Sequence, residues 1–282
     1  MLYFPHCKIN LGLRVLHKRA DGYHELQTVF YPIKDLRDGL EIVTGQAQEK
    51  DILFSSSGLT IDGTTDNNLC VKAYHILKKD FPDLPSVKMH LHKCIPMGAG
   101  LGGGSSDGAA ALKLLNEKFN LGCSRDQLME YALQLGSDCP FFIWDQPCYA
   151  TGRGENLSPL DFSLEAYKII IIHPGIHVST AQAFKELNRD INYSFEGEDL
   201  TEIIRKPIST WRSQLINDFQ QPVIKSHPEI GKIIDELYMH GAFYASLSGS
   251  GSAVYGIFEK DAKPVFDLPS GYFVKWSRES VI

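Results

Sequence analysis

Alternation of hydrophobic and polar residues predicts a β-strand near the start of the chain, over residues 7–16. One face of this strand is apolar and the other is polar or small: Ile9, Leu11, Leu13 and Val15 against Lys8, Asn10, Gly12 and Arg14. A turn at Asp21-Gly22 leads into a second strand. Shorter strands are predicted over 39–45, 51–56 and 87–96. The absence of a side chain at Gly12 is expected to leave space for a ligand.

Apolar residues at helical spacing predict three helices in the same half of the chain. They are 65–81, a helix that begins near Ser105, and 124–136. Thr65 or Asp66 is expected to cap the first helix. Ser124 and Gln127 form a capping-box pattern at the start of the third.

The second half of the chain alternates strands with longer helical segments. Strands are predicted at 167–175, 242–248, 252–259 and 272–277, and helices after Ser179, around 228–241 and over 262–268. Without the inserted helices, this order is βαββαβ, a ferredoxin-like unit. The polar, glycine-containing stretch 151–159 is the expected domain boundary.

Composition limits the classes of function that fit. The chain has 282 residues, 43% of them hydrophobic, and a formal charge of −6, which argues against a nucleic-acid groove. Its longest apolar runs are too short to cross a membrane, and its start does not have the pattern of a signal peptide. Six cysteines without CxxC spacing predict free thiols and no structural zinc. We expect a cytoplasmic protein.

The segment PMGAGLGGGSSDG at 96–108 is the clearest candidate for chemistry. Glycines let the backbone approach a ligand closely, and a helix N-terminus adds N–H groups and a positive dipole end. The combination predicts a site for phosphate. A Cβ at Gly102 or Gly103 is expected to point at the phosphates or to strain the turn. A simple packing turn would explain one or two of these glycines but not five followed by two hydroxyls.

Three other phosphate loops fit the segment less well. The formal GxGxxG of a Rossmann fold, at Gly98, Gly100 and Gly103, lacks the following strand with an acidic end, because another helix start follows instead. A Walker A loop needs a lysine before the serine, where Gly104 stands. A protein-kinase loop would be accompanied by HRD and DFG segments, and neither is present.

Three segments together resemble the motifs of the GHMP kinase superfamily. They are KINLGLRV at 8–15, PMGAGLGGGSSDGAAAL at 96–112 and SLSGSGSAVYGIF at 246–258. The resemblance implies a two-domain α+β protein that phosphorylates a small molecule with ATP. Residues 1–155 would form the ATP-binding domain, with the fold of ribosomal protein S5 domain 2, and 156–282 a ferredoxin-like domain with inserted helices. The segment most weakly matched is 155–240.

The segment KRADGYHELQTVF at 18–30 narrows the resemblance to one branch of the superfamily. Its kinases act on a cytidine-diphosphate-linked polyol in the nonmevalonate route to isoprenoid precursors. By this resemblance, Tyr23 and His24 would bind the cytosine, and Phe184 would close the other side of the base with Thr180 nearby. An ordinary core phenylalanine is the alternative for Phe184.

The resemblance also assigns the remaining roles. Asp138 would accept the proton of the substrate hydroxyl and Lys8 would be its partner, although Asp138 also stands where a helix cap is expected. Adenine would lie near Asn68, Leu69 and Lys93. The predicted ATP-binding residues are Asn68, Leu69, Lys93, Pro96, Met97, Gly98, Ala99, Gly100, Leu101, Gly102, Gly103, Gly104, Ser105 and Ser106. The predicted substrate-binding residues are Asn10, Tyr23, His24, Thr180, Phe184, Ser248 and Gly249.

ATP chemistry implies Mg²⁺, for which Ser105, Ser106 and Asp107 are candidates, but no protein ligand is assigned. A monomer or weak homodimer is expected. Another GHMP kinase, for mevalonate, homoserine or a sugar, is the alternative within the superfamily. A nucleotide-binding regulatory protein without catalysis is the alternative outside it, and the presence of both Lys8 and Asp138 argues against it.

Overall fold

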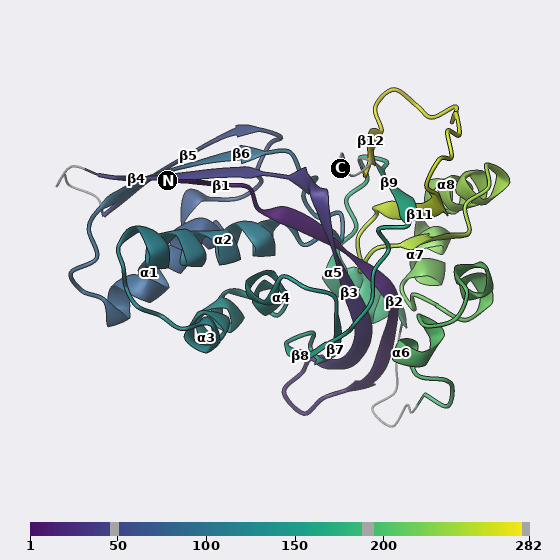
Figure 1. The fold of residues 1–282 in the computed structure, drawn as a ribbon, viewed down its shortest axis with the longest axis horizontal. Helices are drawn as coiled ribbons and strands as arrows, with labels where there is room; N and C mark the ends of the chain where they lie inside the picture. The colour runs from purple at the N-terminus through teal and green to yellow at the C-terminus, as the bar shows by residue number, and fades with distance from the viewer. Residues whose placement is uncertain (46–50, 188–194, 278–282) are drawn as a thin grey trace. The chain divides into compact units, whose positions relative to one another are not determined.

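The computed structural model describes residues 1–45, 51–187 and 195–277 (Figure 1). Its internal contacts divide the chain into two compact units. Unit 1 comprises Met1–Cys7, Leu36–Met97 and Gly102–Asp145, and unit 2 comprises Lys8–Asp35, Gly98–Leu101 and Gln146–Ile282. The glycine-rich segment is therefore shared, because residues 98–101 belong to unit 2 and its remainder to unit 1.

Unit 1 is a four-stranded sheet with helices against one face. The strand order is β1 (Leu2–Tyr3), β4 (Gly39–Thr44), β6 (Val87–Lys93), β5 (Ile52–Gly58), and only the β5–β6 pair is parallel. Alternate residues of β6, beginning with Val87, are buried. The helices are α1 (Leu69–Asp80), α2 (Gly103–Lys118), α3 (Arg125–Leu135) and α4 (Cys139–Trp144). The predicted capping box of α3 is confirmed, since Ser124 and Gln127 exchange both bonds.

The start of the first helix differs from the prediction. Residues Thr65–Asn67 form a separate 3₁₀ turn, and α1 begins only at Leu69. Its cap is Asn68, whose side-chain oxygen accepts from the Cys70 N–H at 2.9 Å, so the assignment to Thr65 or Asp66 was wrong. The extended backbone of Asn68 breaks the helical run and makes it the residue with the geometry of a cap.

Unit 2 contains two sheets. The first has the order β2 (His6–Lys18), β3 (His24–Arg37), β7 (Cys148–Gly152), β8 (Asn156–Pro159). The second has the order β10 (Tyr244–Leu247), β11 (Val254–Glu259), β9 (Tyr167–His173), β12 (Phe273–Trp276), with every neighbouring pair antiparallel. Its helices are α5 (Thr180–Leu187), α6 (Leu200–Ile203), η2 (Ile208–Ser213), α7 (Gln220–Ser226) and α8 (Pro228–Met239).

The second sheet has the strand order of a ferredoxin-like unit, but the predicted helix over 262–268 is absent. Half-buried and exposed residues alternate along the segment, and Val265 is 82% exposed, so the segment has no apolar face at helical spacing to bury. Ala262, Phe266 and Leu268 pack against the core of unit 2, and the Phe266 ring contacts Phe258 and Trp276. An irregular connection to β12 replaces the second helix of the motif.

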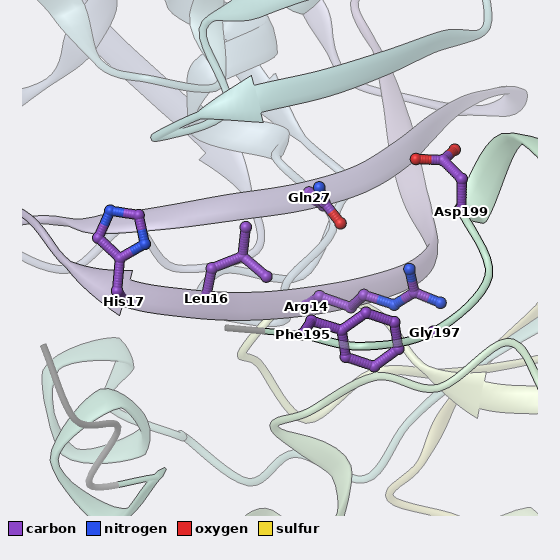
Figure 2. Close-up of a pocket in the computed structure, with 7 residues that line it drawn as sticks. All are labelled: Arg14, Leu16, His17, Gln27, Phe195, Gly197 and Asp199. Atoms are coloured by element: carbon purple, nitrogen blue, oxygen red, sulfur yellow. The ribbon is translucent and has the colours of Figure 1, made fainter. Parts of the chain in front are cut away.

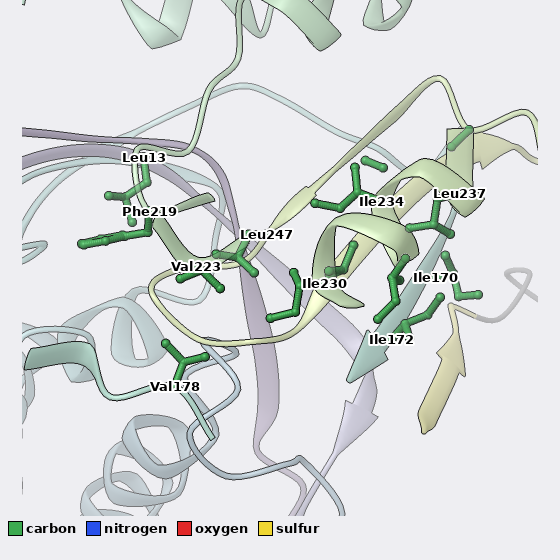
Figure 3. Close-up of a cluster of buried hydrophobic side chains, with 14 of the residues drawn as sticks. Leu13, Ile170, Ile172, Val178, Phe219, Val223, Ile230, Ile234, Leu237 and Leu247 are labelled. Atoms are coloured by element: carbon green, nitrogen blue, oxygen red, sulfur yellow. The ribbon is translucent and has the colours of Figure 1, made fainter. Parts of the chain in front are cut away.

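The core of unit 2 also fixes the first long strand (Figure 3). Leu13 of β2 is buried in the same cluster as Ile172, Phe219, Val223 and Leu247. The Leu13 N–H donates to the Ile216 carbonyl, and the Leu13 carbonyl accepts from Asp218. The middle of β2 is thus anchored to residues far along the chain, which is why it belongs to unit 2.

The expected boundary at 151–159 forms the β7–β8 hairpin, in which Thr151 pairs with Asn156. The domain boundary after residue 155 stays a prediction, because the two compact units are interleaved in sequence and do not correspond to a single division of the chain. All six cysteines are free thiols, as predicted. Within the described residues, every helix is too short or too polar to pass through a lipid bilayer.

Candidate active site

The second half of the glycine-rich segment forms the N-terminus of α2. Gly102 is its N-cap and has a φ of +70°, a left-handed conformation that glycine adopts without a Cβ penalty. Ser106 makes the first intrahelical bond, to the Gly102 carbonyl at 2.9 Å. The preceding N–H groups, from Gly103 to Ser105, are those that a helix cannot pair internally. With the helix dipole, they form a site suited to an anion.

The environments of the two glycines in the first turn of α2, Gly103 and Gly104, correct one expectation. A Cβ on Gly103 would lie 2.8 Å from Ile95 Cγ2 and 2.9 Å from Lys93 Nζ, so this position faces the interior of unit 1. A Cβ on Gly104 would meet no atom within 4 Å. Gly104, rather than Gly103, is therefore the glycine beside open space.

The first half of the segment packs against the third motif, inside unit 2. The Ala253 N–H donates to the Ala99 carbonyl at 3.0 Å. Gly100 has a φ of +82°, and a Cβ there would stand 1.9 Å from the Ser248 carbonyl oxygen. A Cβ on Gly251 would stand 2.1 Å from the Ala99 carbonyl carbon. The two motifs thus meet backbone to backbone, and glycine is required on both sides.

Four residues of the predicted site meet at the Gly100 carbonyl. Lys8 Nζ donates to this oxygen at 3.0 Å and to Asn10 Oδ1 at 2.5 Å. Ser248 Oγ donates to the same oxygen at 3.0 Å. Lys8, Asn10 and Ser248 are each at most 3% exposed. A Cβ on Gly249 would approach the Gly100 oxygen to 3.1 Å.

Gly12 does not leave space for a ligand. A Cβ there would lie 2.9 Å from Leu200 and Leu215 side chains, which occupy that volume. Its φ of +67° shows the actual reason for glycine: the backbone turns out of the strand conformation at this point.

Asp138 is the N-cap residue of α4, followed by Cys139 and Pro140. Its side chain makes no capping hydrogen bond, so a cap does not account for the carboxylate. Ser105, in the first turn of α2, bonds to the Cys139 thiol. The start of α4 thereby lies beside the start of α2 within unit 1. Lys8 belongs to unit 2, and its pairing with Asp138 stays a prediction.

The predicted base-binding residues also meet in part. The His24 and Phe184 rings are stacked, with centroids 4.6 Å apart and an interplanar angle of 19°. Burial, and then the Lys18 charge, lower the pKa of His24, which favours the neutral imidazole. Tyr23 is 53% exposed, and the Arg153 guanidinium lies 4.7 Å from its ring centroid. Thr180 shares a 2.9 Å hydrogen bond with Ser250 of the third motif.

The remaining predicted ATP-binding residues lie around the start of α1 and the end of β6. The Asn68 side chain is occupied as the cap of α1, and Leu69 packs over Gly108 of α2. Pro96 is buried and Met97 is 36% exposed. The Leu101 carbonyl accepts from the Lys8 N–H at 3.0 Å.

Lys93 is enclosed in an ion triad that the sequence reasoning did not identify. Its ammonium bonds to Asp38 and, at 2.7 Å, to Asp107, and all three side chains are at most 4% exposed. Asp38 also accepts from the N–H groups of Cys94 and Ile95. Desolvation, with the charge of Asp38 in addition, raises the pKa of Asp107 to about 8 against the opposing effect of Lys93. The triad joins β6 to the first turns of α2.

The triad bears on the metal candidates. Asp107 Oδ1 has no hydrogen-bond partner among the described residues, but it is buried next to the Lys93 ammonium, which disfavours a second cation. Ser106 is only 2% exposed. Within the described residues, no group of three or more histidine, cysteine or acidic side chains is placed to hold a metal ion. The residues present therefore do not fit a site built by the protein alone.

A polar pocket of about 310 Å³ lies elsewhere in unit 2 (Figure 2). Its lining residues are Arg14, Leu16, His17, Gln27, Phe195, Gly197 and Asp199. The Arg14 guanidinium lies 3.8 Å from the Phe195 ring centroid. None of the lining residues is in the predicted site, so this pocket is not the one expected from the motifs.

Comparison with known proteins gives consistent matches. The GHMP kinases N terminal domain matches residues 68–146, and the GHMP kinases C terminal domain matches residues 199–267. A 4-diphosphocytidyl-2-C-methyl-D-erythritol kinase of Bacteroides thetaiotaomicron is 50% identical over 93% of this chain and 93% of its own. That of Cytophaga hutchinsonii is 44% identical over 92% of each.

Solved structures agree with these relatives. A crystal structure of 4-(cytidine 5'-diphospho)-2C-methyl-D-erythritol kinase has a TM-score of 0.77 and 30% identity, covering 92% of this chain and 91% of that one. The mevalonate kinase of Methanococcus jannaschii has a TM-score of 0.62 at 16% identity, covering 93% and 90%, and shows the fold alone.

The glycine environments predict opposite effects for neighbouring substitutions. Gly104→Val should leave the melting temperature nearly unchanged, since valine is no worse than glycine in a helix, and should raise KM for ATP at least tenfold. Gly103→Val should lower the melting temperature, because its side chain would displace Ile95 and Lys93. Thermal melts and ATP titrations check both. An unchanged KM for ATP in folded Gly104→Val would exclude α2 as the phosphate site.

The triad predicts that two isosteric substitutions, Asp38→Asn and Asp107→Asn, differ in their effect on the free energy of unfolding. Asp38→Asn should cost about 1–3 kcal/mol in urea denaturation, because an amide cannot accept all three of its bonds, whereas Asp107→Asn should cost less. Because the folded-state pKa of Asp107 is raised, its stabilising contribution is present below about pH 4 and lost as pH rises toward 8. Asp107→Asn should flatten this slope, and equal costs for the two variants would contradict the assignment.

Proposed function

Because the chain belongs to the 4-diphosphocytidyl-2-C-methyl-D-erythritol kinases of the GHMP kinase superfamily, we propose that its residues transfer the γ-phosphoryl group of ATP to the position-2 hydroxyl of 4-diphosphocytidyl-2-C-methyl-D-erythritol. The observation that carries the proposal is the buried Lys8 ammonium bonded to the Gly100 carbonyl within the glycine-rich segment. A cation at this place suits a site that handles phosphate. The pathway is the nonmevalonate route to isoprenoid precursors.

The reaction requires a nucleophile, a departing ADP and a destination for one proton. The substrate hydroxyl oxygen attacks the γ-phosphorus, the bond to the β–γ bridging oxygen breaks, and the hydroxyl proton passes to Asp138. The N–H groups of Gly103, Gly104 and Ser105 bind the phosphates at the start of α2, where the helix dipole stabilises their charge. Lys8 offsets charge on the transferring group. Positioning and electrostatics thus supply most of the catalysis.

ATP would bring Mg²⁺ with it. The phosphates would supply most of its ligands, as is usual for this ion. The Ser105 hydroxyl would be the protein ligand, because Ser105 also carries one of the N–H groups proposed to bind the phosphates. Asp107 does not serve, because it is paired with Lys93. Adenine would lie beside Asn68, Leu69 and the backbone of Lys93, because the Lys93 side chain is enclosed by Asp38 and Asp107.

The cytosine would be recognised by the aromatic residues of unit 2. The His24 and Phe184 rings stack on each other with centroids 4.6 Å apart, so a base would contact this pair from outside rather than lie between the two rings. A neutral His24 can both donate to and accept from the edge of a base. Tyr23 adds a second ring whose other neighbour is the Arg153 guanidinium. Mevalonate and homoserine have no base to stack, so these residues favour the cytidyl substrate. We further propose a cytoplasmic enzyme that is a monomer or weak homodimer.

Asp138→Asn should reduce turnover by about 10²-fold or more while leaving binding of ATP and substrate nearly unchanged. The reason is that an amide cannot take the hydroxyl proton. A coupled ADP-release assay with the cytidyl substrate measures kcat, and Asp126→Asn, on the surface of α3, is the matched control. Near-normal turnover of the Asp138 variant would remove its assignment as proton acceptor.

Tyr23→Ala should raise KM for the cytidyl substrate about ten- to a hundredfold, since stacking on an aromatic contributes ~1–3 kcal/mol per base. KM for ATP should hardly change. CMP or CDP should compete with the substrate in the wild type and compete poorly in the variant. Tyr23→Phe and Phe243→Ala, which removes an exposed aromatic elsewhere in unit 2, are the controls. Faster phosphorylation of mevalonate or homoserine by the wild type would reject the cytidyl substrate but not the kinase.

A further inference from the structure

A chain of buried hydrogen bonds runs behind Lys8. Lys8 Nζ donates to Asn10 Oδ1 at 2.5 Å, and Asn10 Nδ2 donates to Thr28 Oγ1 at 2.9 Å. The Thr28 hydroxyl in turn donates to the Gly12 carbonyl at 2.6 Å. Thr28 lies on β3 and is 1% exposed, so water does not replace these partners.

The direction of this chain follows from the chemistry of a hydroxyl. Thr28 has one proton, and it is committed to the Gly12 carbonyl, so toward Asn10 its oxygen can only accept. The Asn10 amide must therefore turn its NH₂ group to Thr28 and its oxygen to Lys8. The reversed amide would place an N–H donor against the ammonium and leave Oδ1 facing an oxygen. The ammonium, which can only donate, and the Thr28 oxygen, which can only accept, therefore require the same orientation of the amide, and Thr28 holds the end that Lys8 does not contact.

The surroundings hold both ends of the chain. Gly12 has a φ of +67° and is packed against Leu200 and Leu215, which fixes the direction of its carbonyl. The Tyr255 hydroxyl donates to the Asn10 carbonyl at 2.7 Å and anchors the backbone of that residue. The Asn10 amide is then held at its oxygen by Lys8 and at its nitrogen by Thr28, so loss of the Thr28 hydroxyl leaves the NH₂ end without its partner.

We propose that Thr28 is a positioning residue for phosphoryl transfer, which fixes the orientation of the Asn10 amide and through it the place of the Lys8 ammonium. Thr28 contacts neither ATP nor substrate in this proposal. The inference rests on the proposed role of Lys8 and deepens it. It predicts an effect on kcat rather than on the binding of ATP.

Thr28→Val removes the hydroxyl and keeps the shape of the side chain. Its kcat should fall about ten- to a hundredfold, in line with a buried polar group left without its partner, while KM for ATP changes less than threefold. Thr28→Ser restores a hydroxyl and should recover most of the kcat. The matched control is Tyr31→Phe on the same strand, which removes a hydroxyl that accepts from the Leu164 N–H at 2.9 Å. It should lower stability without lowering kcat.

A second measurement tests the orientation itself. A carboxylate has oxygens at both ends, so an aspartate at position 10 presents an acceptor to Lys8 whichever way it is turned. In the Asn10→Asp background, Thr28→Val should therefore lower kcat less than threefold further. If Thr28→Val does not fold, Thr28→Ala, which fits within the space of threonine, takes its place in the same cycle.

These measurements distinguish a failure of the proposed function from a failure of the role proposed for Thr28. Absence of wild-type turnover with the cytidyl substrate would reject the proposed function. Given wild-type turnover, an unchanged kcat in Thr28→Val, an equal loss in Thr28→Ser, or an equal loss in both backgrounds at position 10 would overturn the role of Thr28. A loss confined to the Asn10 background and relieved by serine would support it.

Discussion

The carbonyl oxygen of Gly100 is the acceptor around which unit 2 arranges its polar residues. Lys8 reaches it from β2, Ser248 reaches it from the third motif, and backbone contact at Gly251 excludes any side chain between the two loops. Gly100 has a left-handed φ, and its half-buried carbonyl accepts both side-chain donors. Three segments that are far apart in sequence are thereby required to meet at one atom.

Unit 1 contains a buried group of three ionisable side chains, Lys93, Asp38 and Asp107. One ammonium, Lys93, faces two carboxylates, and these are not equivalent. Asp38 satisfies its oxygens with two backbone N–H groups as well, whereas Asp107 retains one oxygen without a partner. Desolvation, and then the charge of Asp38, raise the pKa of Asp107 although Lys93 opposes them. Its place between β6 and α2 holds the helix whose N-terminus is proposed to bind phosphate.

The local structure was predictable where a short pattern decides it. Strand alternation at 7–16 and the Ser124 capping box follow from neighbouring residues. The succession of strands and helices in the second half predicted a ferredoxin-like unit, and the second sheet has the strand order of that unit. The helix expected at 262–268 was wrong because apolar spacing cannot show that Val265 lacks a surface to pack on. Asn68 rather than Thr65 caps α1 because a 3₁₀ turn intervenes, and spacing does not distinguish the two. Motif resemblance predicted Lys8, Asn10 and Ser248 as site residues. Thr28 and Asp38 bond to partners distant in sequence, so no local pattern marks them.

The division of the chain into two interleaved units limits which fragments of it can fold. The backbone passes between the two units after Cys7, Asp35, Met97, Leu101 and Asp145, so neither unit is a continuous stretch of sequence. A fragment that ends before the second sheet would leave Leu13 of β2 without the residues around Leu247 against which it is buried. Contacts of such long sequence separation also slow folding, because the chain must lose the entropy of closing a long loop before the stabilising contacts form. A continuous stretch of sequence that contains all segments of one unit therefore also contains segments of the other.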